Sequence, residues 1–112
     1  MVIALFEHRL RADIDVDEWE RTFDRMVALA SEMPGLISID GYASPDGMRL
    51  AVVRFESDEA LQAWKNHPEH LRAQARGREA FFDFYKVTVA SSIIREYESQ
   101  ATEDAGRPSG LS

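Results

Sequence analysis

Residues 36–56 read LISIDGYASPDGMRLAVVRFE, and this stretch decides the fold. Both of its ends are rich in the β-branched and other apolar residues that favour strands. Between them, Ser44-Pro45-Asp46-Gly47 provides proline and glycine at positions that suit a tight turn. The stretch therefore predicts a β-hairpin, with strands over residues 36–43 and 48–56.

A helix is expected before this hairpin. Asp15 is a suitable N-cap, and Glu18 three residues later completes a capping-box pattern. Apolar residues then recur at three- and four-residue spacing, which is typical of a helix with one buried face. Met33-Pro34-Gly35 ends the pattern, because proline and glycine do not continue a helix.

A second helical region is expected after the hairpin. Ser57 is a suitable N-cap for a helix that reaches Asn66. Pro68 interrupts this helix, and proline is favourable at a first helical position, so we expect His67 to cap a new piece that ends near Gly77. A further short turn is expected over residues 79–83.

The outer segments complete a known arrangement. Residues 2–10 and 85–98 have the composition of strands, which gives the order β-α-β-β-α-β. This order predicts an α+β fold with an antiparallel, ferredoxin-like sheet and both helices on one face. The opposite face would be left uncovered, and we expect a second copy to cover it in a two-fold homodimer.

Length and charge narrow the class of protein. With 112 residues we expect the chain to be one domain, which we place at residues 1–98, followed by a tail over 99–112 whose composition favours disorder. The net charge of −7 makes nucleic acid an unsuitable partner. No apolar run is long enough to span a membrane, and the chain has no cysteine. We therefore expect a cytoplasmic protein without disulfides or cysteine-ligated metal.

Several short motifs resemble one family. They are the start Met1–Glu7 (MVIALFE), Met33–Leu36 (MPGL) and Phe55–Trp64 (FESDEALQAW), followed by His70, Gln74, Gly77-Arg78 and Phe81-Phe82. In their order and spacing they resemble the antibiotic biosynthesis monooxygenase (ABM) family. The resemblance implies a dimeric α+β barrel with a pocket between each sheet and its helices. Some members oxidise aromatic polyketides with O₂ and without metal or flavin, whereas others bind and degrade haem.

The resemblance and the residue types together suggest a site. We expect His70 or Glu7 to act as a base, since imidazole and a buried carboxylate can both accept a proton near neutral pH. The other candidates would hold an aromatic ring or stabilise developing charge. They are Trp64, Asn66, Gln74, Arg78, Phe82 and Tyr85. The expected function is cofactor-independent oxidation of a small aromatic or enol-type substrate with O₂.

Other functions stay open at this point. A dimer that binds a small molecule without catalysis would use the same pocket. Haem binding is a third alternative, although residues 2–9 lack the strand-one asparagine of haem-degrading relatives. His67 and His70 bracket Pro-Glu in a spacing that suits a metal, and Glu69 or His8 could add a ligand. Because no carboxylate cluster accompanies them, we expect no metal site and no cofactor.

Overall fold

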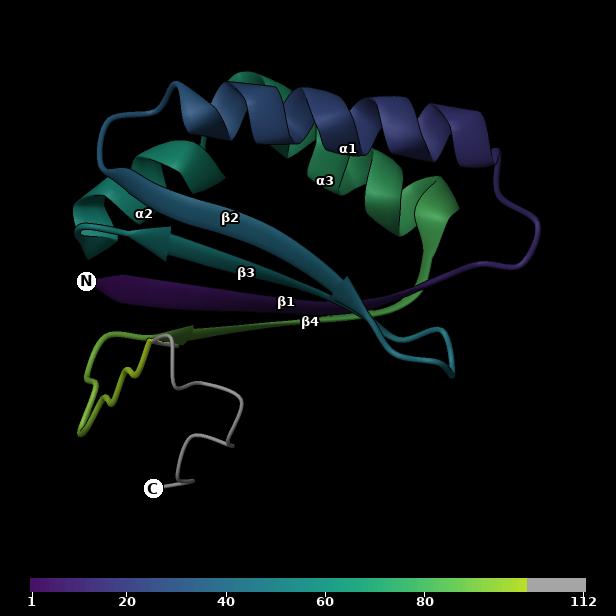
Figure 1. Ribbon diagram of the computed structural model, residues 1–112. Coiled ribbons are helices and arrows are strands. Elements are labelled where there is room, and N and C mark those ends of the chain that lie inside the picture. The colour runs from purple at the N-terminus through teal and green to yellow at the C-terminus, as the bar shows by residue number, and fades with distance from the viewer. Residues whose placement is uncertain (101–112) are drawn as a thin grey trace.

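The computed structural model describes residues 1–100 and contains one antiparallel sheet with helices on one of its faces (Figure 1). The elements follow in the order β-α-β-β-α-α-β, with one turn of π-helix, η1, before the last strand. Their bounds are β1 Val2–Leu10, α1 Val16–Ser31, β2 Leu36–Ala43, β3 Arg49–Phe55, α2 Asp58–Lys65, α3 Pro68–Arg76, η1 Gly77–Phe81 and β4 Phe82–Ala90. This is the predicted ferredoxin-like arrangement.

The strands lie in the order β2-β3-β1-β4, so the two ends of the chain's regular structure meet side by side. β1 pairs antiparallel with both β3 and β4, and His8 lies between Arg49 on one neighbour and Tyr85 on the other. Since residues directly opposite each other on neighbouring strands share a face, this register groups residues that are far apart in the sequence. It positions the candidate site described below.

Local signals determine where most elements begin and end. The Asp15 carboxylate accepts a hydrogen bond from the Glu18 amide, and the Ser57 hydroxyl oxygen accepts one from the Ala60 amide. The His67 ring accepts one from the Glu69 amide, which confirms it as the N-cap of α3. Gly47 closes the β2–β3 turn with a φ of 91°, a conformation that glycine adopts without steric cost.

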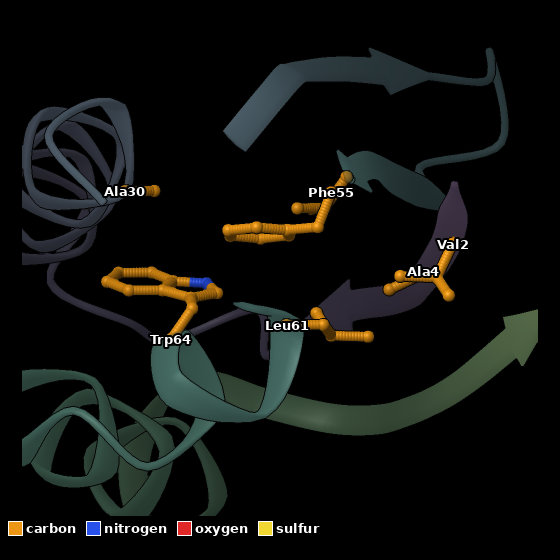
Figure 2. Close-up of a cluster of buried hydrophobic side chains, with 7 residues drawn as sticks. Val2, Ala4, Ala30, Phe55, Leu61 and Trp64 are labelled. Carbon is orange, nitrogen blue, oxygen red and sulfur yellow. The ribbon is translucent and has the colours of Figure 1, made fainter. Parts of the chain in front are cut away.

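The core lies between the sheet and the helices (Figure 2). Phe55 from β3 and Trp64 from α2 are its largest buried side chains, and Figure 2 shows both rings in the space between the sheet and the helices. Ala30 of α1 has no exposed surface, which lets that helix approach closely. The remaining buried members come from both strands and helix: Val2, Ala4, Val53 and Leu61.

The C-terminal part differs from the prediction in two respects. The final strand begins at Phe82 and ends at Ala90, whereas residues 85–98 were expected, so the interpretation of residues 91–98 as strand was wrong. The expected turn over 79–83 is a π-helical turn over residues 77–81, which ends earlier because Phe82 and Asp83 already belong to the sheet. The prediction of disorder from residue 99 concerns residues that lie almost entirely outside the described part.

No helix within residues 1–100 has the length and hydropathy needed to cross a membrane.

Candidate functional site

Three of the predicted site residues lie together at the junction of α2 and α3. The Trp64 and His70 rings are stacked, with centroids 4.0 Å apart and planes 13° from parallel. His70 Nδ1 donates a hydrogen bond to the Trp64 carbonyl at 3.0 Å, and Gln74 Nε2 donates to the Lys65 carbonyl at 3.1 Å. The cluster therefore joins the two helices across the break at Pro68.

This cluster packs against the hydrophobic core. Trp64 is only 4% exposed and belongs to the hydrophobic core (Figure 2). Burial lowers the pKa of His70, an effect that its hydrogen bond to the Trp64 carbonyl partly offsets and that nearby His67 increases. Neither the hollow between α1 and the sheet nor the one between α1 and α3 has Trp64, His70 or Gln74 in its wall. The geometry thus accounts for these residues as a structural junction.

The other candidates do not join this cluster. Along β1 the side chains of Val2, Ala4 and His8 are buried on the helix-covered face, and Glu7 has the opposite parity. Glu7 consequently lies on the face away from the helices, so it does not share a site with His70. Asn66 and Arg78 are exposed, at the end of α2 and in η1 respectively.

Phe82 and Tyr85 lie near a different histidine. His8 is the only buried polar residue among residues 1–100, with 3% of its surface exposed. Its ring stacks on Phe6 with centroids 4.4 Å apart, and the Phe82 ring meets it edge-on at 5.1 Å. Tyr85 is the β4 residue opposite His8, and its ring lies 6.4 Å from Phe6 and Phe82.

One nitrogen of His8 is open. Nδ1 lies 3.2 Å from the Phe6 carbonyl, and because a carbonyl only accepts, Nδ1 carries the ring proton. Nε2 then has a free lone pair and no hydrogen-bond partner. Within residues 1–100 no side-chain nitrogen or oxygen is both fully buried and unpartnered, so Nε2 keeps contact with solvent. Burial lowers the pKa of His8, the Phe6 hydrogen bond partly offsets this, and the Arg49 charge adds to the lowering.

His8 lines a hollow of about 250 Å³ between α1 and the sheet. Trp19 and Phe23 of α1 stack on each other at 5.5 Å and form one wall, and the Arg49 guanidinium lies 4.8 Å from the centre of the Trp19 ring. Tyr42 also borders the hollow, but it pairs with Leu50, the partner of Glu7, so its side chain lies on the face away from the helices. The hollow therefore combines flat apolar walls, one cation and one neutral imidazole, which is the composition of a small-molecule site.

Two residues hold Phe82 beside His8. A Cβ atom added at Gly77 would lie 2.5 Å from the Phe82 ring, so only glycine permits this contact. The Arg11 guanidinium donates to the carbonyls of Arg78, Glu79 and Phe82 at 3.0, 2.9 and 3.1 Å. These bonds satisfy carbonyls at the end of η1 and fix the point at which the chain enters β4.

The alternation of residues along the first strand contained a signal that His8 is buried. Residues 2, 4, 6, 8 and 10 share one face of the first strand, because side chains alternate along a strand, and all but His8 are apolar. An imidazole flanked by apolar positions on one strand face is expected to be buried with them, and this pattern identifies His8. Arg49 and Trp19 had no such signal, because only the strand register and the packing of α1 bring them to the His8 hollow. No three His, Asp or Glu side chains of residues 1–100 are grouped as metal ligands.

Comparison with known proteins agrees with this architecture. The family model for antibiotic biosynthesis monooxygenase matches residues 1–76, from β1 to the end of α3. The uncharacterized protein YqjZ of Bacillus subtilis (strain 168) is 35% identical over 83 residues, which are 74% of this chain and 73% of that protein.

Two solved structures illustrate the similarity of fold. Rv0793 from Mycobacterium tuberculosis superposes with a TM-score of 0.74 at 24% identity, covering 86% of this chain and 98% of that one. SnoaB, a cofactor-independent oxygenase from Streptomyces nogalater, has a TM-score of 0.70 at 14% identity, covering 87% and 97%. The match to the family model, which extends over more than half of the sequence, shows that this chain belongs to the antibiotic biosynthesis monooxygenase family.

Proposed function

We propose that this protein oxidises a small aromatic or enol-type substrate with O₂, without a cofactor, in the hollow between α1 and the sheet. The observation that carries this proposal is the open Nε2 of His8, a neutral imidazole nitrogen at an aromatic-lined hollow beside Arg49. The family membership and the structural similarity to SnoaB, described as a cofactor-independent oxygenase, support the type of chemistry.

His8 is the base in this proposal, in place of His70 or Glu7. A neutral imidazole accepts the proton of a phenol or enol, and Arg49, its cross-strand neighbour, stabilises the resulting anion. The electron-rich anion reacts with O₂ directly. When a ring CH₂ becomes a carbonyl, one oxygen atom stays on the carbon and the other leaves as water with both hydrogens. The substrate supplies all four electrons, so no further reductant is needed.

The hollow limits the substrate. Its volume of about 250 Å³ lies just below the range of roughly 300–1,000 Å³ that is usual for small-molecule sites. Trp19 and Phe23 present flat surfaces on which a ring can stack. A compact aromatic molecule with an acidic hydroxyl group fits both the walls and the charge of this site.

We also propose that the protein is a homodimer. β4 is an edge strand whose Val87 and Val89 are 57% and 51% exposed, and Phe84 and Tyr85 are exposed beside them. Phe84 pairs with Arg9 and so lies on the face that the helices leave uncovered, together with Ile3 and Leu5, whereas Tyr85, Val87 and Val89 lie on the other face of β4. A second copy that covers β4 and the uncovered face would remove both an edge strand and an apolar patch from water.

A direct test compares two single substitutions. Oxygen uptake is measured with a panel of hydroxyanthrones and hydroxyquinones, for the wild-type protein, His8→Gln and His70→Gln. We expect His8→Gln to lower kcat by about 10²–10⁴-fold, the usual contribution of a general base, and His70→Gln to leave it close to wild type. The reverse order would return the catalytic role to the α2–α3 junction.

The same panel separates the alternative functions. If a compound raises the melting temperature and oxygen is not consumed, the protein is a binder and the oxygenase proposal is wrong. If haem addition produces a Soret band and His70→Gln removes it, the protein is a haem-binding member of the family. Oxygen uptake that depends on His8 supports the proposal.

A further inference from the structure

A second hollow lies between α1 and α3 and shares no residue with the His8 hollow. Its volume is about 350 Å³, and four of its lining residues are arginines: Arg21, Arg25, Arg72 and Arg76. This concentration of positive charge is unexpected in a protein whose net charge is −7. It is a local property of two helix faces that the fold brings together (Figure 1).

Two ion pairs bridge the hollow at its ends. Arg25 of α1 donates to Glu69 of α3 at 2.9 and 3.1 Å, and Arg76 of α3 donates to Glu18 of α1 at 2.7 and 3.0 Å. Both ion pairs are bidentate, with two guanidinium nitrogens donating to the two carboxylate oxygens, and this is the stronger form of an arginine–carboxylate pair. The carboxylates are therefore saturated by their arginines. The pairs also show that the helices run antiparallel, since the later residue of α1 meets the earlier residue of α3.

Arg21 and Arg72 lie between these two pairs, one on each helix. The residue numbers of each ion pair add to 94, and the same antiparallel register brings Arg21 and Arg72 opposite each other within one residue. Within residues 1–100 neither side chain forms an ion pair or a hydrogen bond, and both are exposed. Arg76 also lies 3.9 Å from Glu79, so Arg21 and Arg72 are the two arginines of the lining without a carboxylate partner within residues 1–100.

The geometry selects a particular kind of anion. A carboxylate is planar and presents its two oxygens to one guanidinium, so it would satisfy one of the two free arginines. A phosphate monoester is tetrahedral, carries close to two negative charges at neutral pH and has three terminal oxygens, so it can bind two arginines that come from neighbouring helices. Met26 and Ala73 add apolar surface to the wall, which suits the organic part of such a molecule.

We propose that the hollow between α1 and α3 is a binding site for the phosphate group of a small organic phosphate monoester. Arg21 and Arg72 bind the phosphate oxygens. The Arg25–Glu69 and Arg76–Glu18 pairs connect the two helices on either side of these two arginines. This site is separate from the proposed oxygenase site and does not depend on it.

Titration calorimetry with glycerol phosphate tests the proposal, at pH 7.5 and constant ionic strength. We expect saturable binding to the wild-type protein with one site per chain. The double variant Arg21→Gln/Arg72→Gln should bind at least about tenfold more weakly, because it loses two charge-assisted contacts. The control is Lys65→Gln/Arg95→Gln, which removes the same charge from exposed positions outside the hollow and should bind like the wild type.

Three results would overturn the proposal. The first is an absence of saturable binding of glycerol phosphate to the wild-type protein. The second is an equal loss of affinity in both double variants, which would indicate a general charge effect. The third is an unchanged affinity in Arg21→Gln/Arg72→Gln. Inorganic phosphate is titrated in parallel, and tighter binding of the inorganic ion than of glycerol phosphate would contradict the ester. The variant His8→Gln should bind glycerol phosphate normally, so a failure of the oxygenase proposal leaves this measurement unaffected.

Discussion

Two parts of this molecule each contain a histidine stacked on an aromatic ring, and they differ in whether a hollow lies beside that histidine. At the α2–α3 junction, His70 stacks on Trp64, and the hydrogen bonds of His70 and Gln74 end on backbone carbonyls of α2. Between α1 and the sheet, His8 stacks on Phe6 and lies at the wall of a hollow. In both histidines only Nδ1 has a hydrogen-bond partner within residues 1–100, so the adjacent space, and not the residue type, distinguishes His8.

The largest expected effect tests whether the junction is structural. Trp64→Ala should lower the free energy of unfolding by about 3–5 kcal/mol, because it opens a cavity in the core. Trp19→Ala removes a half-buried ring from the hollow and should cost only about 1–2 kcal/mol, while weakening binding of an aromatic ligand. Urea denaturation measures both values. Equal costs for the two tryptophans would remove the distinction between junction and hollow.

The next effect tests the packing of Phe82 beside His8. Gly77→Ala should cost about 1–3 kcal/mol, because the added methyl group would lie 2.5 Å from the Phe82 ring and displace it. Gly41→Ala is the matched control, since its methyl group would lie 3.7 Å from Phe23, an ordinary contact distance. Urea denaturation should find the control close to wild type. A neutral Gly77→Ala would show that Phe82 adjusts freely and that its position beside His8 is not fixed.

Local signals in the sequence predicted most of the fold, because hairpin turns and helix caps depend on neighbouring residues. Asp15, Ser57 and His67 all act as the caps that their positions suggested. The end of the last strand was not predictable in the same way. Residues 91–98 include β-branched residues that suit a strand, but β4 pairs with β1 only as far as Ala90, opposite Ile3. Strand length here is set by the partner strand.

The candidate site was harder to predict, because it depends on long-range register. Trp64, His70 and Gln74 are close in sequence and were correctly grouped, but sequence proximity says nothing about whether space remains between them. His8 and Arg49 are neighbours only through the pairing of β1 with β3. Phe82 reaches them only because the π-helical turn η1 starts β4 three residues earlier than its composition indicates.

A smaller effect concerns the cation in the hollow. Arg49→Gln should weaken binding of an anionic phenol about tenfold, which corresponds to about 1.4 kcal/mol, because it removes the charge that faces the ligand. Binding of the uncharged parent ring should change little, since Trp19 and Phe23 remain. Fluorescence titration with a matched phenol and methyl ether measures the difference. Equal weakening for both ligands would assign Arg49 to supporting Trp19, over whose ring it lies.

The smallest expected effect distinguishes the two histidines by pH. Burial lowers the pKa of both His8 and His70 in the folded protein, so the unfolded chain binds more protons between the folded values and about 6.5. Each histidine therefore contributes stability that is complete above about pH 6.5 and is lost as the pH falls through that value towards the folded pKa. Between pH 7.5 and 5.5, the free energy of unfolding measured by urea denaturation should fall less in His8→Gln and in His70→Gln than in the wild type. A ligand that fills the hollow should deepen the acid loss in the wild type and in His70→Gln but not in His8→Gln, because only His8 is desolvated further. If the ligand deepens the acid loss in His8→Gln but not in His70→Gln, the ligand binds beside His70 and the assignment of the site to His8 is wrong.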